Sequence, residues 1–412
     1  MTLADVDVRR IHRRGQFVLI AGQALAGVGM GGTFSAGALL VTQVSGSEAL
    51  SGMAATGTTV GAALAAIPLA RLAQRAGRAP SLATGALVAA AGGVVGIIAA
   101  VLVSVPLLLA GLVLVGVGTA VNLQSRFAAT DLSEPGTRGR DLAFVVWATT
   151  VGAVLGPNLI GPGDALGRAL GLPSLAGPFL FTIAAQAMAA GIYFFFLRPD
   201  PLKLAERITR ERPLDAGAVV DVPHADRNGV ATGLIALALS HATMVGIMSM
   251  TPVHLADHGA TLEIVGLTIS LHVAGMFALS PVFGWLSDRV GREPVIVVGQ
   301  VILLAALVLV HFGAEDNAVV VVALILLGLG WSAATVAGSS LIAESADPLR
   351  RTVTQGRADL TMSAAGAVGG ALAGPALAAL GYEGLGLAAT GLVAVVLVAV
   401  AFRVARRARQ VA

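Results

Sequence analysis

Long apolar segments alternate with short polar ones along the whole sequence. Each apolar segment is long enough to cross a hydrocarbon core of about 30 Å as an α-helix, which needs roughly 20 residues. In lipid, a single segment satisfies its backbone polar groups only as a helix, so each one predicts a transmembrane helix. Twelve helices are expected, with ends set to within a few residues. They cover 16–43, 48–70, 82–103, 105–127, 141–162, 173–196, 231–256, 263–286, 294–312, 318–343, 356–380 and 385–403.

A polar stretch over 197–230 divides the helices into two sets of six. The sequence therefore predicts an all-α membrane protein with a six-helix bundle over 1–196 and a second one over 231–412. The stretch 197–230 itself mixes basic residues with acids and prolines, and we expect a linker on the membrane surface.

The two halves also resemble each other in sequence. RLAQRAGRAPS at 71–81 aligns with WLSDRVGREPV at 285–295, and GAVLGP at 152–157 aligns with GALAGP at 370–375. Repeated six-helix halves are typical of secondary transporters, whose solute site lies near the middle of the membrane at the interface of the repeats.

The amino-acid composition excludes several classes of protein. The chain is 56% hydrophobic and 12% charged, whereas soluble domains have about 25% charged residues. Cysteine is absent, which rules out disulfides and thiolate ligands. The net charge of +3 comes from basic residues in loops and at the chain ends and does not indicate a nucleic-acid partner. No phosphate-binding loop of the type G-x-x-x-x-G-K-[ST] occurs, so we expect a gradient-driven protein rather than an enzyme.

Basic residues in alternate loops predict the orientation of the chain. Arginines precede the first helix, follow the second and fourth, and end the sequence, while the other loops are mostly acidic. The positive-inside rule therefore places both termini and the linker in the cytoplasm, in a multi-pass protein of the cytoplasmic membrane.

Histidine and methionine recur at the expected middle of two neighbouring helices. Met244 and Met248 lie four residues apart in the seventh helix, and His272 and Met276 lie four apart in the eighth. Each pair shares one helical face, and at 1.5 Å per residue all four fall near the same depth. Thioether sulfur selects Cu(I), and imidazole also suits copper. Since we expect no Asp or Glu deep inside any helix, the four residues predict a copper site, with His241 as a secondary ligand.

Simpler interpretations of these residues remain open. Methionine often fills gaps in a core, and a histidine in a helix can bond a neighbouring carbonyl group. His254 and His258, near the outer end of the seventh helix, could capture metal at the mouth or be solvated loop residues. Gln124 and Arg126 could face a central cavity, or Arg126 could pair with Asp131 or a nearby carbonyl group.

The loop GWLSDRVGRE at 284–293 and its earlier copy resemble the signature loops of the major facilitator superfamily. This resemblance covers nearly the whole chain and implies that both loops help to close the cytoplasmic gate. A carboxylate such as Asp288 would act at the positive end of a neighbouring helix, and Gln74 replaces that acid in the first copy. The gating residues are therefore expected to be Gln74, Arg75, Gly77, Arg78, Asp288, Arg289, Gly291 and Arg292, and the helix kinks are expected at Gly156, Pro157, Gly374 and Pro375.

The order M-x-x-x-M then H-x-x-x-M also resembles the CcoA-type copper importers, a bacterial branch of that superfamily that supplies copper for cytochrome oxidase assembly. The resemblance implies import of a copper ion or small copper complex, as cargo rather than cofactor, by a monomer in the lipid bilayer. The alternative is a proton-coupled exporter of drugs or other small molecules.

Overall fold

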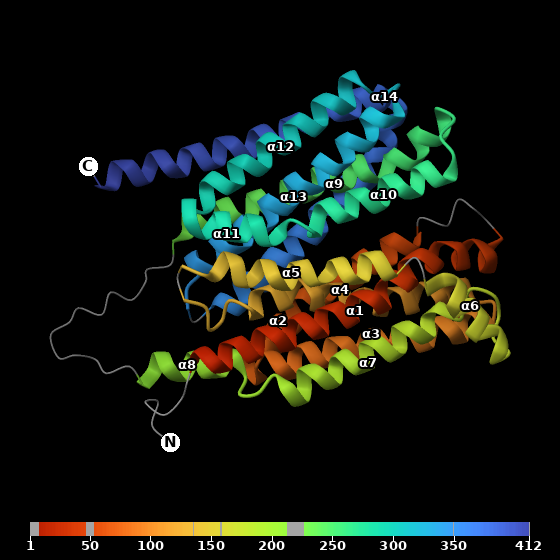
Figure 1. Cartoon of the computed structure of the whole chain (residues 1–412), viewed down its shortest axis with the longest axis horizontal. Coiled ribbons are helices and arrows are strands. Elements are labelled where there is room, and N and C mark those ends of the chain that lie inside the picture. The colour runs from red at the N-terminus through yellow and green to blue at the C-terminus, as the bar shows by residue number, and fades with distance from the viewer. Residues whose placement is uncertain are drawn as a thin grey trace. The chain divides into compact units, whose positions relative to one another are not determined.

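The computed structural model describes residues 8–46, 53–134, 136–156, 159–211, 226–348 and 350–411, which form helices joined by short turns (Figure 1). The first half holds α1 (Val8–Ser45), α2 (Met53–Ala76), α3 (Arg78–Val101), α4 (Val105–Ala128), α5 (Arg138–Leu155), α6 (Ile160–Ala169), α7 (Pro178–Phe196) and the short α8 (Pro201–Glu211). The second half holds α9 (Arg227–Asp257), α10 (Leu262–Phe277), α11 (Ser280–Val290), α12 (Arg292–Phe312), α13 (Asn317–Ser345) and α14 (Arg351–Val411).

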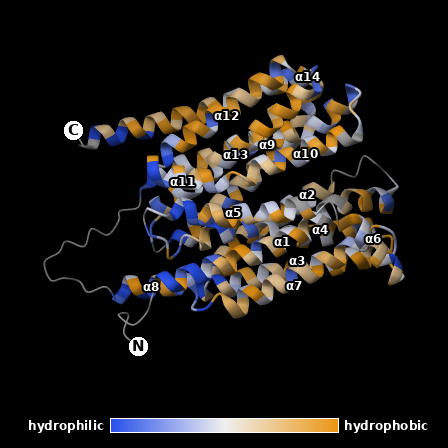
Figure 2. Cartoon of the chain, in the orientation of Figure 1, coloured by the Kyte–Doolittle hydropathy of each residue, from blue (hydrophilic) through white to orange (hydrophobic). Residues whose placement is uncertain are grey.

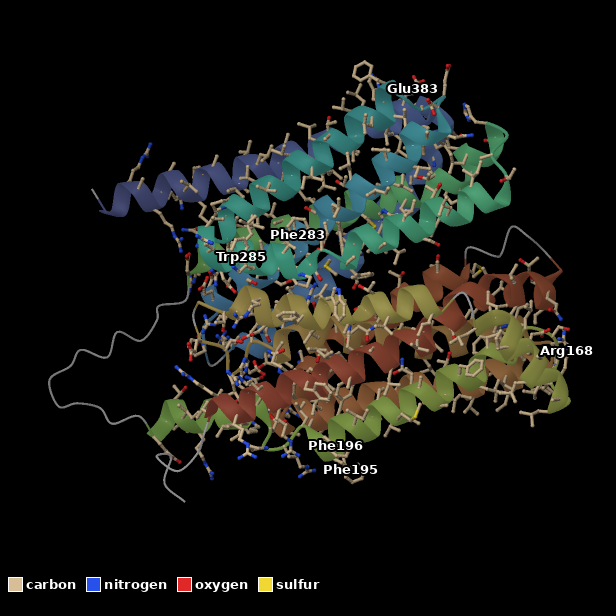
Figure 3. The ribbon with its side chains drawn as sticks, viewed as in Figure 1. Arg168, Phe195, Phe196, Phe283, Trp285 and Glu383 are labelled. Carbon is tan, nitrogen blue, oxygen red and sulfur yellow. The ribbon has the colours of Figure 1, made fainter. Side chains whose placement is uncertain are left out.

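Ten helical stretches of the described residues are long and apolar enough to span a membrane. Hydrophobic residues run along most of the long helices, whereas α8 carries hydrophilic ones (Figure 2). Large side chains on the outside of these helices are apolar too. Phe195 and Phe196 project from the end of α7 and are 67% and 55% exposed (Figure 3). The all-helical membrane fold expected from the sequence is therefore confirmed.

Two interruptions of helical backbone involve glycine, one inside the fifth expected span and one between the last two expected spans. The fifth span ends as α5 at Leu155 and resumes as α6 at Ile160, so the break expected at Gly156 is present, while Pro157 lies outside the described residues. The backbone of α14 stays helical through Gly374 and Pro375, so a kink at these residues stays a prediction, and the helix is interrupted at Gly381, with φ 71°. Only glycine adopts such a φ readily, so Gly381 separates the last two spans.

Two compact units make up the chain. Unit 1 contains Met1–Glu134, Val151–Ala225 and Asp347–Leu360, and unit 2 contains Pro135–Thr150, Asp226–Ala346 and Thr361–Ala412. Each unit is built mainly from one half of the sequence. Two helices are shared, because the start of α5 belongs to unit 2 and the first turns of α14 belong to unit 1.

Small residues allow close packing inside each unit. In unit 1, a Cβ atom at Gly61 of α2 would lie 1.8 Å from the carbonyl oxygen of Val113 in α4. In unit 2, a Cβ at Gly299 of α12 would lie 2.9 Å from the backbone nitrogen of Ala334 in α13. Membrane helices associate through such close backbone approach, so glycine is needed at these two positions.

Candidate functional site

The second signature loop joins α11 to α12 in unit 2 and is built around Asp288. Its Oδ1 and Oδ2 atoms accept hydrogen bonds from the backbone N–H groups of Gly139 and Arg140, each at 2.8 Å, at the start of α5. The first N–H groups of a helix have no partner within the helix and carry partial positive charge. The carboxylate therefore lies at the positive end of a helix, as the sequence indicated. Gly291 ends α11 with φ 99°, a conformation that favours glycine.

The two arginines of this loop differ in environment. Arg289 is exposed, and its guanidinium lies 5.2 Å from the ring of Trp285, which is itself 49% exposed on α11 (Figure 3). Arg292 is buried and pairs with Asp288 at 3.1 Å and with Glu344 at 3.0 Å. Ion pairs therefore hold the side chain of Arg292 inside unit 2, whereas that of Arg289 lies on the surface.

The first signature loop, in unit 1, receives its carboxylate from a distant part of the chain. Gly77 has φ 103°, like its counterpart in the second loop. Asp200 accepts hydrogen bonds from the backbone N–H of Ala79 at 2.8 Å and from that of Leu202 at 3.1 Å, so it caps the starts of both α3 and α8. Lys203 donates to the carbonyl oxygen of Gln74 at 2.8 Å. Asp200 therefore supplies the carboxylate that Asp288 supplies in the second loop. The sequence of the first loop did not indicate this residue.

Of the remaining basic residues of this loop, Arg75 is exposed and Arg78 is fully buried. Arg78 donates to both oxygens of Asp131, at 2.8 and 3.1 Å, and to the side-chain oxygen of Gln355 at 2.7 Å. Paired charges with several hydrogen bonds are the form in which ions are tolerated inside a protein. Arg78 therefore joins α3 to the end of α4 and to the first turns of α14.

Arg126 of α4 forms a second buried ion pair in unit 1. Its Nη2 atom lies 2.7 Å from Oδ1 of Asp359 in α14, and both side chains are almost completely inaccessible. Gln124 instead donates to the carbonyl oxygen of Ala66 at 3.0 Å. Asp131 is therefore the partner of Arg78 rather than of Arg126. Asp359 lies near the start of its expected span, and its side chain is fully buried within unit 1.

The predicted copper ligands lie in unit 2 around α13. Met244 is 3% exposed in a hydrophobic cluster, and Met248 and Met276 pack against that cluster. His272 is fully buried, and its Nδ1 atom donates to the carbonyl oxygen of Leu324 at 2.7 Å. Both α9 and α10 pack chiefly on α13 rather than on each other. The four residues thus surround one helix, and a shared ion remains a prediction.

His241 has a different hydrogen-bonding role from the one expected for a metal ligand. Trp331 of α13 donates its indole N–H to Nδ1 of His241 at 2.9 Å, so in the neutral ring the hydrogen is on Nε2. Phe277 contacts Trp331 edge-on, with ring centroids 5.8 Å apart. The three side chains form a mixed aromatic and polar group, which we call the Trp331 cluster (His241, Phe277 and Trp331).

His254 and His258 are engaged at the end of α9. His254 bonds the carbonyl oxygen of Ala314 through Nε2 at 2.7 Å and stacks on Tyr382 at 4.1 Å. His258 bonds the carbonyl oxygen of His254 through Nδ1 at 2.8 Å. These contacts support a structural role at the helix end. Within the described ranges, no three side chains of His, Cys, Asp or Glu come together as a metal site, so metal capture here remains a prediction.

Comparison with known proteins agrees with this geometry. The sequence model of the Major Facilitator Superfamily matches residues 19–254 and 233–411. The chain is 38% identical over 370 residues to the uncharacterized MFS-type transporter YdeG of Bacillus subtilis, covering 89% of this chain and 86% of the relative. It is 29% identical over 352 residues to the riboflavin transporter RfnT of Brucella anthropi, covering 85% of each.

Solved structures show the same fold. The human organic anion transporter MFSD10 superposes with a TM-score of 0.76 at 17% identity, covering 94% of this chain and 99% of that one. A bacterial homologue of the iron transporter ferroportin, in its outward-facing state, gives 0.69 at 14% identity, covering 94% and 98%. With the duplicated loops and the helical architecture, these matches establish that the chain belongs to the Major Facilitator Superfamily.

Proposed function

We propose that the protein is a secondary transporter that carries a small organic molecule with an aromatic ring across the cytoplasmic membrane by alternating access. Membership of the superfamily supports a membrane transporter of this kind rather than an enzyme. The observation that carries the choice of solute is the Trp331 cluster of unit 2.

The position of the Trp331 cluster suits a solute site. Trp331 is the central residue of the 29-residue helix α13. His241 lies 14 residues from the first residue of α9, which is about 21 Å along the helix. Both positions correspond to the middle of a membrane, where transporters of this architecture bind their solutes.

The chemistry of the cluster suits an aromatic solute with hydrogen-bonding groups. A solute would stack on the rings of Trp331, which is 5% exposed, and Phe277, which is half-buried. The bond from Trp331 fixes the neutral imidazole of His241 in the form that carries its hydrogen on Nε2, where it can donate to a carbonyl or ring nitrogen. Riboflavin has such groups, and the relative RfnT is a riboflavin transporter, so riboflavin is the first solute to test.

We propose the same orientation as the sequence suggests, with both termini in the cytoplasm and the signature loops forming the cytoplasmic gate. The orientation follows from the basic loops, and the two capping carboxylates, Asp288 and Asp200, support a gating role because each one fixes the start of a helix against its loop. A monomer is the working unit in this proposal.

The test is uptake of labelled riboflavin by cells that overproduce the protein and lack other riboflavin transport. Wild type is expected to accumulate riboflavin, and Trp331→Ala to lose it by roughly tenfold, because stacking and one hydrogen bond together contribute about 1–3 kcal/mol. Trp285→Ala is the matched control, since this tryptophan is exposed on α11, and it should leave uptake unchanged. Unchanged uptake by Trp331→Ala, or failure of wild type to bind any aromatic solute of a panel, would overturn the proposal.

Copper import is a second candidate, favoured by one feature of His272. Its Nδ1 atom is engaged with Leu324, and its buried Nε2 atom has no hydrogen-bond partner among the described residues. Histidines that bind metals commonly use one nitrogen this way while a backbone carbonyl holds the other. Met276 lies one turn further along the same helix, and its thioether suits Cu(I).

Copper binding is tested by metal quantification on purified protein after loading with Cu(I) and removal of excess metal. If copper is the cargo, wild type retains about one ion per chain, and His272→Ala loses it. Met250→Ala is the control, because Met250 packs against the same hydrophobic cluster but is not one of the predicted ligands. Equal copper content in wild type and His272→Ala would end the copper interpretation.

A further inference from the structure

The first turns of α1 carry exposed arginines that are followed by an exposed aromatic ring. Residues three, four and seven positions apart lie on one side of a helix. Four exposed residues of α1 follow this spacing, and we call them the α1 basic face (Arg10, Arg13, Arg14 and Phe17). Phe17 is 72% exposed. The helix contains no acidic residue from Val8 to Ser45, so α1 itself provides no counter-charge.

The surroundings neutralise little of this charge. Arg9, beside the α1 basic face, pairs with Glu134 at 3.2 Å, but the two side chains are 82% and 62% exposed. Such surface pairs contribute little energy. Arg13 and Arg14 make no ion pair or hydrogen bond with the rest of the described chain. Their guanidinium groups are therefore available to an external anion.

A further arginine lies next to this surface, after the end of α7. A Cβ atom at Gly15 of α1 would lie 3.9 Å from the side chain of Leu197, so Arg198, the next residue, lies beside the first turns of α1. Arg198 is exposed and donates through Nε to the carbonyl oxygen of Phe194 at 3.0 Å, with its guanidinium 5.0 Å from the Phe194 ring. These contacts hold the side chain in place and leave both Nη groups for an anion.

The α1 basic face lies where the helix is expected to enter the bilayer. The apolar span of this helix is expected to begin at residue 16, so the arginines precede the hydrocarbon core and Phe17 lies at its edge. From Arg10 to Phe17 the helix rises about 10 Å, slightly more than one headgroup region of about 5–8 Å. The arginines therefore lie at the depth of lipid phosphates.

Helix α8, in the same unit, also has exposed arginines but does not present a single charge. Arg207 and Arg210 are exposed, and Glu206 and Glu211 flank them. Arg207 pairs with Glu211 at 3.5 Å. The mixed charges of α8 favour water over an anionic surface, whereas the charges of the α1 basic face are all positive.

We propose that the α1 basic face and Arg198 bind the headgroups of anionic phospholipids in the cytoplasmic leaflet, and that the ring of Phe17 lies among the upper parts of their acyl chains. Guanidinium groups bind phosphate through paired hydrogen bonds, and basic residues next to a membrane helix attract anionic lipids. An aromatic ring beside them adds apolar contact. The proposal goes beyond the transported solute, and it rests on the proposed orientation only for the choice of leaflet.

Native mass spectrometry of the detergent-solubilised protein tests this binding. The protein is equilibrated with equal concentrations of phosphatidylglycerol, which is anionic, and phosphatidylcholine, which has a phosphate but no net charge. Each arginine near a bilayer surface favours anionic lipid about fivefold. Wild type should therefore retain phosphatidylglycerol preferentially, and Arg13→Gln/Arg14→Gln should lose roughly 25-fold of that preference. Arg13→Lys/Arg14→Lys keeps the charge and should keep most of it.

Further variants separate a lipid-binding surface from net charge alone. Arg207→Gln/Arg210→Gln on α8 is the matched control, because it removes the same charge from exposed positions, and it should keep the preference. Phe17→Ala should weaken retention of both lipids and leave their ratio unchanged. Size-exclusion chromatography shows which variants are folded, and if Arg13→Gln/Arg14→Gln does not fold, Arg198→Gln provides the same test with a loss of about fivefold.

Three results would overturn the proposal. Wild type could retain the two lipids equally, the glutamine variants of the surface could keep the full preference, or the α8 control could lose as much as they do. Displacement of phosphatidylglycerol by an equal concentration of inorganic phosphate would also refute a lipid surface in favour of a site for free anions. No solute is present, so each result is independent of the riboflavin test.

Discussion

Replacing Asp288 with alanine removes the carboxylate that caps the start of α5. The magnitude follows from its contacts. The hydrogen bond from Gly139 is partly buried, and that from Arg140 is exposed. Losing a charge-assisted bond to a partly buried N–H costs about 1.5–3 kcal/mol, whereas water largely replaces an exposed one. The lost interaction with the helix dipole adds about 0.3–1 kcal/mol.

The expected destabilisation is therefore about 2–4 kcal/mol. Arg292 loses one partner but keeps Glu344, so it adds little to this value. For a folding unit of this size, each kcal/mol lowers Tm by about 2–4 °C, and Asp288→Ala should lower Tm by roughly 4–16 °C.

Thermal unfolding of the purified protein in detergent, followed by tryptophan fluorescence, measures this shift. Arg289→Ala is the matched control, because its exposed side chain lies over the exposed Trp285 ring, and it should change Tm by about 2 °C or less. If Asp288→Ala unfolds within that same range, the carboxylate does not stabilise α5 and the capping argument fails.

Three further outcomes are expected from the same assay. Gly291→Ala should lower the free energy of unfolding by about 1–2 kcal/mol, because a φ of 99° strains any residue with a side chain. Gly391 has open space around it, so Gly391→Ala should be neutral or stabilising. Equal Tm values of the two variants would contradict the strain argument. Gly61→Val should prevent folding, because its Cβ would overlap the backbone of α4, and recovery of folded variant protein would disprove the close packing. Burial raises the pKa of Asp226, but the hydrogen bond from Arg403, a backbone hydrogen bond and nearby arginine charges outweigh this effect, so the pKa lies below its ordinary value. The stability that Asp226 contributes is therefore present above about pH 4 and lost as the pH falls below that value. Asp226→Asn should lose less Tm than wild type over that range, and an identical pH profile of the two proteins would contradict this.

Helix positions could be predicted from the sequence because the membrane imposes a simple rule. A run of about 20 apolar residues is detectable without knowledge of its neighbours. The expected spans correspond to the observed helices, apart from the breaks between Leu155 and Ile160 and at 278–279 and differences of several residues at some helix ends. The turn glycines were also predictable, since Gly77 and Gly291 stand at the same place in two copies of one loop and both have positive φ.

The partners of charged residues could not be predicted in the same way. Asp200 caps a loop that lies more than a hundred residues earlier in the chain, and Asp359 finds Arg126 across an even longer separation. In the sequence, Asp359 sits near the start of an apolar segment and is indistinguishable from an acid at the membrane surface. Only the packing of α14 in unit 1 makes it a buried charge.

A helical membrane protein with two related halves could be predicted from the linear sequence, because hydropathy and repetition are detectable without knowing which residues are in contact. The sequence also indicated which loops carry the signature residues. Only the three-dimensional structure shows which carboxylate pairs with which arginine. It also shows that Trp331 fixes the position of the hydrogen on His241 and that His272 donates a hydrogen bond to a carbonyl oxygen of α13. These pairings depend on which faces of distant helices are in contact. In this chain, small residues on many helix faces allow close approach, so the sequence does not indicate which faces pair, and only the packed structure shows it.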